Sequence, residues 1–389
     1  MIANRLFRLS TSATAELENQ VAALRRQGVT DLIPLGIGEP YCETPDHIRL
    51  AAWNALRSGQ TRYGPTAGEY ELRAAIAEKL RRENGLKVRP EEVVVTAGAK
   101  FAIFLVFLAA LDPGDAVVIP EPAWVTYQPA AELAGAQALL VPCDEKAGFQ
   151  PDVKSVKKIL CEYNKVKMLI LNSPCNPTGA VYTPYLIREI ASIAKRQNIL
   201  LLSDECYEYF IYEGEHYSPA SEFDNVVTVN AFSKAYSMTG WRLGYVTGPK
   251  ELLEGVLKIY QHSLTCVPSF VQAAGIEALC NEKSRKFVNQ MVEEHRKRRD
   301  LMVELIRRSE FWDLKTVPQG AFYVFPAYKV SIPSNVLAQR LLMECHVATV
   351  PGVAFGPSGE GHLRLSYSLK EVALLREAFS RMEDFFKRL

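Results

Sequence analysis

The sequence lacks the features that mark membrane, secreted and nucleic-acid-binding proteins. Its longest apolar run, residues 101–111, is too short to cross a bilayer, and residues 1–5 contain no apolar signal-peptide core. The 45 basic and 44 acidic residues give a net charge of +1, so no excess of charge favours nucleic acid or an anionic membrane. We therefore expect a cytoplasmic protein with neither a nucleic-acid partner nor a membrane partner.

Cysteine and histidine are both sparse and scattered. The eight cysteines form no Cys-x-x-Cys pair, and the six histidines do not cluster with them at metal-ligand spacing. Free thiols in a reducing compartment are the default for such a pattern. We expect free cysteines and no metal site.

Short apolar runs alternate with amphipathic stretches through the middle of the chain. We expect helices at 100–111 and 185–197, the second with Thr183 as N-cap and Pro184 at its first position. Near-continuous apolar strands separated by helices indicate an α/β fold with a mostly parallel central sheet covered on both faces. The expected strands are residues 92–96, 116–119, 167–171, 199–202 and 225–229.

The pattern changes after about residue 285. A long charged helix at 283–308 is followed by alternating strands at 321–325 and 362–367, which is typical of a smaller α+β domain. The N-terminal helix at 15–27 is expected to pack with it. A length of 389 residues suits two domains, so we predict a large domain at 41–285 and a small domain formed by 1–40 and 286–389.

Lys234 lies in an apolar stretch where charge is scarce. Between residues 225 and 249 the only charged side chains are Lys234 and Arg242. A lysine in apolar surroundings loses hydration, which favours the neutral amine, and a neutral amine is a nucleophile toward aldehydes. The stretch thus points to Schiff-base chemistry, although a solvated loop lysine explains its composition equally well.

Two turns after predicted strands could hold a ligand, because parallel sheets bind ligands beyond the carboxyl ends of their strands. The turn at 96–100 contains Gly98 and leads into a helix whose free N–H groups would attract an anion. The turn at 172–179 is made rigid by two prolines and a glycine and could hold Asn176 toward a ligand. Tight structural turns are the alternative explanation at both places.

Two charged residues in predicted strands need partners. Asp204 ends a buried apolar strand, where a carboxylate is costly unless it meets a cation such as a protonated heterocyclic nitrogen or an arginine. Its neighbour Glu205 is expected to cap or pair locally. Arg364 lies opposite Leu363 and Leu365 in strand alternation, and its planar fork suits a carboxylate; an edge-strand arginine facing water is the alternative.

Two aromatic residues complete the candidate site. Trp124 follows the predicted strand at 116–119 and could stack on a flat ring or fill core space. Tyr63 lies in a Gly/Pro loop, where its phenol would be accessible.

Taken together, these motifs resemble the class I pyridoxal-phosphate aminotransferases of fold type I, and they are most similar to the prokaryotic aspartate aminotransferases of the branch that includes the thermophilic bacterial enzymes. The likeness covers essentially the whole chain. The matching motifs, in order, are Gly38-Glu39-Pro40, Tyr63-Gly64-Pro65, Gly98-Ala99-Lys100, Trp124, Asn176-Pro177-Thr178-Gly179, Asp204-Glu205-Cys206-Tyr207, Ser233-Lys234, Arg242 and Arg364.

The resemblance implies that pyridoxal 5′-phosphate is the cofactor. Lys234 would hold it covalently and then move the substrate proton, and Asp204 would keep the ring nitrogen protonated. Tyr207 and Asn176 would hydrogen-bond the ring oxygen, and Trp124 would stack on the ring. The residues implied for the phosphate are Gly98, Ala99, Lys100, Ser233 and Arg242, joined by Tyr63 of the partner subunit in a homodimer with shared active sites.

The resemblance also implies how an amino acid and a 2-oxo acid would bind. Arg364 would grip the α-carboxylate. A distal carboxylate would meet Lys100, which favours aspartate as donor and 2-oxoglutarate as acceptor. Asn176 and the Gly38 backbone would assist at the first carboxylate, and Ser12 and Thr14 at the second. Trp124 is also implied among the substrate-binding residues.

Some positions depart from the resembling family. Tyr41-Cys42 stands where relatives often have Asp-Phe, residues 101–104 form an apolar helix start, and Ala231 replaces a glycine or serine. Aromatic donors or prephenate therefore stay open as substrates. A pyridoxal-phosphate lyase on the same fold is a second hypothesis. A cofactor-sensing regulator is a third, disfavoured because no helix-turn-helix pattern precedes the large domain.

Overall fold

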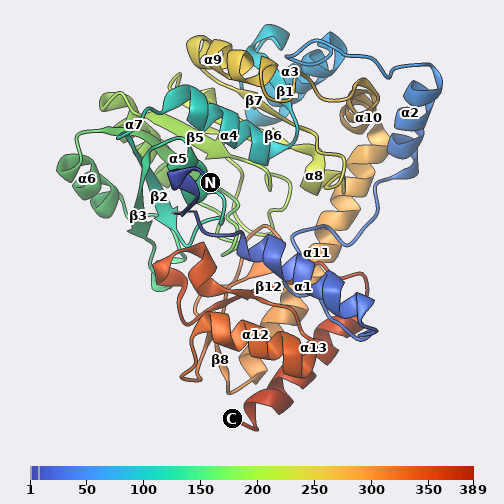
Figure 1. The fold of residues 1–389 in the computed structure, drawn as a ribbon, viewed down its shortest axis with the longest axis vertical. Coiled ribbons are helices and arrows are strands. Elements are labelled where there is room, and N and C mark those ends of the chain that lie inside the picture. Colours follow the sequence, from blue (N-terminus) through green and yellow to red (C-terminus); the bar gives the residue numbers. More distant parts are fainter. Residues whose placement is uncertain (1, 8) are drawn as a thin grey trace.

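A large body and a smaller body are joined by the long helix α11 (Glu282–Arg308) in the computed structural model (Figure 1). The structure describes residues 2–7 and 9–389. Met1 and Arg8, which belong to the N-terminal part of the predicted small domain, lie outside the described residues. The predicted charged helix at 283–308 is confirmed to within one residue.

The large body is built on a seven-stranded sheet with the strand order β1-β7-β6-β5-β4-β2-β3. β7 runs antiparallel to both of its neighbours, and the other neighbours pair in parallel. The predicted mostly parallel sheet is therefore confirmed; β3 and β7 were not predicted as strands. The bounds are β1 (Val93–Thr96), β2 (Ala116–Glu121), β3 (Gln137–Pro142), β4 (Val166–Asn172), β5 (Leu200–Asp204), β6 (Val226–Ala231) and β7 (Gly244–Thr247).

Helices cover both faces of this sheet, because its central strands are apolar on both sides. One face packs against α4 (Ala99–Ala110), α5 (Tyr127–Leu133) and α9 (Lys250–Gln261). The opposite face packs against α6 (Val153–Glu162), α7 (Pro184–Arg196), α2 (Asp46–Arg57), α3 (Tyr70–Asn84), α10 (Ser269–Cys280) and the short α8 (Phe232–Ala235).

The helix α7 begins as its sequence predicts. Thr183 Oγ1 accepts a hydrogen bond from the Leu186 N–H at 3.2 Å, and Pro184 occupies the first helical position, where its missing N–H costs nothing.

The smaller body contains a three-stranded sheet in the order β11-β12-β9 and a two-stranded pair, β10-β8. The predicted strand at 321–325 is wrong in extent, because only two of its residues form β9. Ala321 has a φ of 55°, in the left-handed region, which interrupts extended backbone. The strands are β8 (Trp312–Asp313), β9 (Tyr323–Val324), β10 (Ala327–Tyr328), β11 (Val350–Pro351) and β12 (Leu363–Ser366).

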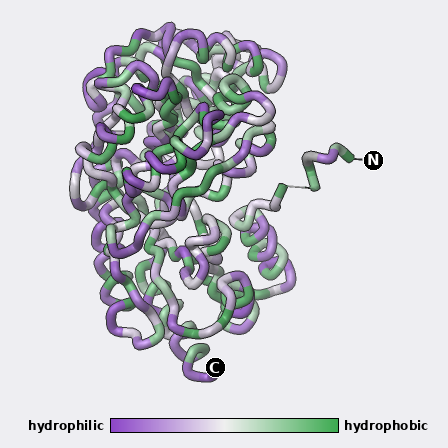
Figure 2. The backbone as a smooth tube through the Cα atoms, turned by 90° about the vertical axis from the view of Figure 1, so that its left-hand side faces the viewer, coloured by the Kyte–Doolittle hydropathy of each residue, from purple (hydrophilic) through white to green (hydrophobic). Residues whose placement is uncertain are grey.

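Three helices complete the smaller body: α1 (Ala13–Arg26), α12 (Ser334–Cys345) and α13 (Ala373–Phe386). The expected packing of the N-terminal helix is confirmed, because Val21 of α1 shares an apolar cluster with Leu342 and Ala348. Before α1, a short 3₁₀ turn (Asn4–Phe7) extends away from the body (Figure 2).

The carboxyl ends of β4, β5 and β6 lie along one edge of the large sheet. Asn172 and Asp204 are direct partners in the β4–β5 register, and Asp204 pairs with Val229 in β6. Residues of the smaller body face this edge, so the fold creates a crevice there. Among residues 2–7 and 9–389, none of the helices combines the length and the apolar character needed to cross a membrane.

Candidate active site

A cavity of about 450 Å³ lies between the carboxyl edge of the large sheet and the smaller body. It brings together side chains that are far apart in the sequence and were predicted separately. The predicted site residues that line it are Thr14, Gly38, Ala99, Lys100, Trp124, Asn176, Asp204, Tyr207, Ser233, Lys234, Arg242 and Arg364.

Lys234 lies in α8, directly after β6 reaches the edge of the sheet. Its Nζ donates to the Gly38 carbonyl oxygen and lies about 6 Å from the rings of Tyr207 (6.0 Å) and Phe322 (5.9 Å). Burial lowers the pKa of the amine to about 8. The solvated-loop alternative is therefore excluded, and the amine is neutral in a useful fraction of molecules near pH 7.

Asp204 is a buried carboxylate whose partner is a phenol. Tyr127 donates its hydroxyl to Asp204 Oδ2 at 2.7 Å, and the Cys206 N–H donates to Oδ1 at 3.2 Å. Burial raises the pKa of Asp204, although these hydrogen bonds oppose the shift. No lysine, arginine or histidine forms an ion pair with it in the described part of the chain, so the predicted cation partner is not a side chain there.

Tyr207 and Asn176 line the cavity, and each hydrogen-bonds to a residue of the smaller body. The Tyr207 hydroxyl is 2.9 Å from that of Tyr323, and Asn176 Oδ1 accepts from Arg364 Nη1 at 3.0 Å. Burial raises the pKa of Tyr207, so its phenol stays protonated and can donate to an oxygen in the cavity.

The start of α4 forms a cradle that suits an anion. Gly98 is the N-cap, with a φ of 80°, and a Cβ at this position would lie 2.7 Å from Arg242 Nη2. Only glycine combines this backbone conformation with that close approach. The guanidinium of Arg242 and the N–H groups of Ala99 and Lys100 are thus gathered near Ser233, which also lines the cavity.

Arg364 projects from β12, the central strand of the smaller sheet, and is only 2% exposed. This burial excludes the alternative of an edge-strand arginine facing water. Its Nη2 donates to the Gly36 carbonyl at 2.7 Å, its Nε has no hydrogen-bond partner, and no described carboxylate forms an ion pair with it. A buried cation with an unused donor favours an anionic ligand at this place.

Lys100 is the next residue of the cavity lining, and it is exposed. Its Nζ is 5.4 Å from the centre of the Trp124 ring, which itself packs edge-on against Tyr127 at 5.4 Å. Burial and the charge of Arg242 lower the pKa of Lys100. Trp124 therefore lines the cavity and also packs against Tyr127.

Three predicted residues do not line the cavity. Gly98 is in close contact with the guanidinium of Arg242, which does line the cavity. Ser12 is one step removed, with its Oγ 3.1 Å from Thr14 Oγ1. Tyr63 is 89% exposed and lies outside the cavity.

Several cavity residues were missed by the sequence interpretation. They are mainly polar and aromatic groups whose roles depend on contacts over long sequence separations. Tyr127 had one available signal, since it follows Trp124 by three residues in a predicted loop after a strand. The missed residues include Glu18, Glu39, Tyr127, Asn172, Cys206, Thr239 and Tyr323.

These groups fit pyridoxal phosphate. The buried carboxylate of Asp204 lacks a cation that a protonated ring nitrogen would supply, and the glycine cradle at Gly98 suits a phosphate. A partly neutral Lys234 amine lines the same cavity. The donor set is therefore complementary to each of the three polar parts of this cofactor.

Comparisons with known proteins agree with this chemistry. The family model described as aminotransferase class I and II matches residues 30–382. A probable aspartate/prephenate aminotransferase of Aquifex aeolicus is 44% identical over 383 residues, which cover 96% of each chain. The aspartate/prephenate aminotransferase of Thermus thermophilus is 43% identical over 386 residues and 98% of each chain. The solved structure of the Thermus thermophilus aspartate aminotransferase with maleate superposes with a TM-score of 0.94 at 41% identity over 99% of both chains.

Proposed function

The chain belongs to the class I and II aminotransferases, and on that premise we propose that it transfers the amino group of L-aspartate to 2-oxoglutarate. The enzyme depends on pyridoxal phosphate and has the fold of type I. When bound, this cofactor supplies an aldehyde and an electron sink. The observation that carries the substrate proposal is that two cations, Arg364 and Lys100, line the same cavity as Lys234.

The residues at the sheet edge would hold the cofactor. Asp204 would pair with the protonated ring nitrogen, Tyr207 and Asn176 would donate to the ring oxygen, and Trp124 would stack on the ring. The phosphate would be held at the start of α4 by the Ala99 and Lys100 N–H groups, Ser233 and Arg242, with Gly98 allowing their approach. The support is the cradle geometry at Gly98.

Lys234 would hold the cofactor through its aldehyde and would move the substrate proton. Its depressed pKa supports both tasks, because a neutral amine can attack the aldehyde and can accept the proton from the substrate Cα near neutral pH. Tyr207 and Phe322 border the amine and restrict the space through which it moves.

Arg364 would bind the α-carboxylate through its planar fork, helped by Asn176 and the Gly38 backbone. Arg364 already bonds to Asn176, so the fork is held in place before the substrate arrives. Lys100, with Thr14 and its neighbour Ser12, would bind the distal carboxylate. Two separated cationic positions suit the alternation of amino and keto diacids that a transaminase requires.

Prephenate is a second candidate substrate. Two relatives are named aspartate/prephenate aminotransferases, and prephenate carries a carboxylate distant from its 2-oxo acid group, which the same two cations could bind. Aromatic amino donors have no distal carboxylate, so Lys100 would have no anionic group to bind. A lyase that releases pyruvate and ammonia would make no use of a second carboxylate position.

We include a homodimer with shared active sites in the proposal. Tyr63 is 89% exposed and lies outside the cavity of its own chain, so Tyr63 of the partner subunit would supply the remaining phosphate contact. The helix α2 also supports a dimer, because its large apolar side chains Leu50 and Trp53 are each 56% exposed, and a second chain would cover them.

A cytoplasmic location is likewise proposed, and its support is the eight free cysteines.

The division into a large domain at 41–285 and a small domain formed by 1–40 and 286–389 is also part of the proposal. It is supported by the packing of α1 with the smaller body. The helix α11 connects the two bodies and would carry any motion between them.

The proposed function is tested by mixing the holoenzyme with single amino acids and following the loss of the cofactor's visible absorbance, and then by assaying products with 2-oxoglutarate. We expect aspartate to discharge the cofactor fastest and to yield oxaloacetate and glutamate. Aromatic amino acids discharging it faster than aspartate, or pyruvate and ammonia formed without glutamate, would overturn the proposal.

A further inference from the structure

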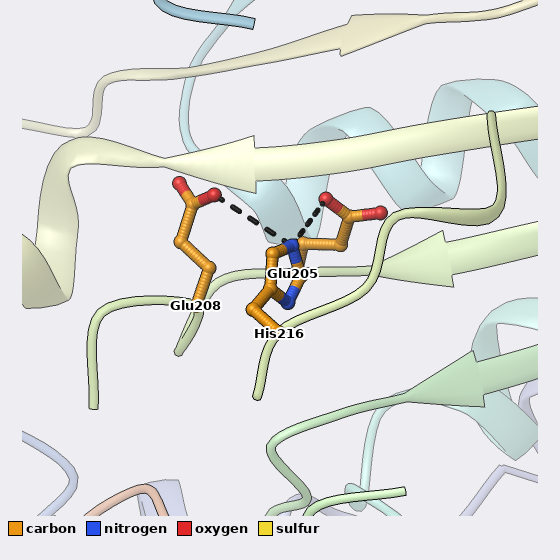
Figure 3. A group of neighbouring side chains, drawn as sticks. All are labelled: Glu205, Glu208 and His216. Atoms are coloured by element: carbon orange, nitrogen blue, oxygen red, sulfur yellow. Dashed lines mark hydrogen bonds and ion pairs between the residues drawn. The ribbon is translucent and has the colours of Figure 1, made fainter. Parts of the chain in front are cut away.

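A buried cluster of charged side chains lies directly behind the active site. Glu205 and Glu208 follow β5, and both carboxylates face the imidazole of His216 (Figure 3). The His216 Nε2 lies 3.1 Å from Glu205 Oε2 and 3.8 Å from Glu208 Oε2. Glu205 is 1% exposed, whereas Glu208 and His216 are partly buried.

The three ligand-type side chains could geometrically surround a metal ion, but their oxygens already receive protein donors. Glu205 Oε1 accepts from Ser203 Oγ at 2.9 Å and Ser218 Oγ at 2.6 Å. Glu208 Oε1 pairs with Lys79 Nζ, and Glu208 Oε2 accepts from Asn84 Nδ2 at 2.7 Å. A metal held by the three side chains would have to displace the Asn84 amide, whose Nδ2 lies 3.3 Å from Glu205 Oε2, 2.7 Å from Glu208 Oε2 and 3.2 Å from His216 Nε2. The cluster is therefore an internal hydrogen-bonded network rather than a metal site.

The ionisable groups of the network influence one another. Burial alone would lower the pKa of His216, but its bond to Glu205 and the charges of both glutamates raise it above the usual value. The charges of Lys79 and His216 lower the pKa of Glu208 against the effect of burial. Both carboxylates also accept several protein hydrogen bonds, which is the condition under which a buried polar network is rigid.

The network is bonded to two segments that carry the site. Glu205 adjoins Asp204 and Glu208 adjoins Tyr207, both of which line the cavity. On the other side, Asn230 Nδ2 donates to Glu208 Oε1 at 2.6 Å.

Asn230 completes the link to the lysine. Its own Oδ1 accepts from the Ala231 N–H at 2.7 Å, three residues before Lys234. One carboxylate, that of Glu208, therefore ties the turn of Asp204 and Tyr207 to the turn of Lys234.

We propose that Glu205, Glu208 and His216, with Lys79, Asn84 and Asn230, form a positioning network that fixes Asp204, Tyr207 and Lys234 relative to one another. The inference rests on the proposed function for its activity readout. Catalytic groups need to be held to a fraction of an ångström, and displacement of about 1 Å can cost about a hundredfold in rate. The network would hold the backbone segments that carry Asp204, Tyr207 and Lys234.

The experiment compares three variants of the full-length holoenzyme. Asn230→Ala removes the link between the two turns and leaves the glutamate–lysine pair intact. Glu208→Gln keeps the shape but places an amide against donors on both sides. Glu213→Gln is the matched control, because Glu213 lies in the same connecting segment and bonds to the buried Arg299 at 2.9 Å, but has no contact with the network.

We expect Asn230→Ala and Glu208→Gln to lower kcat by about tenfold or more with little change in KM for aspartate. We also expect the visible circular dichroism per bound cofactor to decrease in both, because the ring is held less asymmetrically. Glu213→Gln should match the wild type in both measurements. If Glu208→Gln fails to fold, Asn230→Ala decides the matter.

A purely structural network would give a different result. Asn230→Ala and Glu208→Gln would then lower the melting temperature while kcat and the dichroism stay at wild-type values, and that outcome would overturn the proposal. A wild-type enzyme without transaminase activity would contradict the proposed function and not the network. The comparison of visible circular dichroism would then still show whether the network positions the cofactor.

Discussion

The Tyr127 hydroxyl lies 2.7 Å from Asp204 Oδ2, and both residues are buried and line the cavity. The two residues are 77 positions apart, on α5 and at the end of β5. This hydrogen bond stabilises the charged form of a carboxylate whose pKa burial would otherwise raise further. The hydrogen bond from Tyr127 therefore favours the ionised form of Asp204, the acid that we propose for the ring nitrogen.

We expect Tyr127→Phe to weaken cofactor binding by about tenfold, because loss of one hydrogen bond to a carboxylate costs roughly 1.5 kcal/mol. Titration of the apoprotein with pyridoxal phosphate measures the effect. Tyr260→Phe is the control, since Tyr260 packs in the same apolar cluster and its buried hydroxyl has no partner. Equal affinities in the two variants would contradict the role of Tyr127.

The depressed pKa of Lys234 predicts the pH dependence of cofactor uptake. An amine with a pKa of about 8 is about one-tenth neutral at pH 7 and half neutral at pH 8. Because the neutral form attacks the aldehyde, the rate of uptake by the apoprotein should rise about fivefold from pH 7 to 8 and by less than about twofold from pH 8 to 9.

An ordinary lysine would give a different profile, with a rise of about tenfold per pH unit across the same range. Lys234→Ala should remove the visible absorbance of the lysine-bound cofactor and nearly all turnover. Transamination retained in that variant would show that another group carries the chemistry.

Gly98→Ala should weaken the binding of the phosphate group. The substitution puts a Cβ 2.7 Å from Arg242 Nη2 at a φ of 80°, so both the backbone and the guanidinium must move. We expect affinity for pyridoxal phosphate to fall by about tenfold or more, since strain of this kind costs roughly 1–3 kcal/mol.

Gly59→Ala separates the two causes of that loss. Gly59 has a φ of 85°, and no atom lies within 4 Å of the place that an alanine Cβ would occupy, so the change adds backbone strain without a contact. Both variants should lose stability in thermal unfolding. Only Gly98→Ala should lose more affinity for pyridoxal phosphate than for pyridoxal, which lacks the phosphate, and an equal loss for both ligands would argue against the cradle.

The sequence predicted the parts of the site that follow from local pattern. Apolar runs identified β4, β5 and β6, and the polar residues at their ends had to meet because parallel strands end at one edge. Lys234 stood out because charge is absent around it. The cap of α7 at Thr183 depended only on neighbouring residues.

Long-range partners could not be predicted in the same way. Tyr127 has the character of a core residue in sequence, and only the packing of α5 against the sheet gives it Asp204 as a partner. His216 is separated from Glu205 by a loop, so spacing alone did not indicate their contact. Tyr63 is a further case, because the contact proposed for it depends on a second chain.

Lys100 is expected to determine the preference for dicarboxylic substrates. Lys100→Met keeps most of the aliphatic stem beside Trp124 and removes the charge, so packing is preserved while the distal carboxylate loses its partner. A charge-assisted hydrogen bond contributes about 2 kcal/mol, so kcat/KM for aspartate should fall about thirtyfold while that for phenylalanine changes by less than about threefold. Lys250→Met, at an exposed lysine whose nearest acid is Glu254 at 3.9 Å, is the control and should leave both values unchanged. Equal losses for aspartate and phenylalanine would mean that Lys100 acts on the cofactor phosphate and that another group selects the side chain.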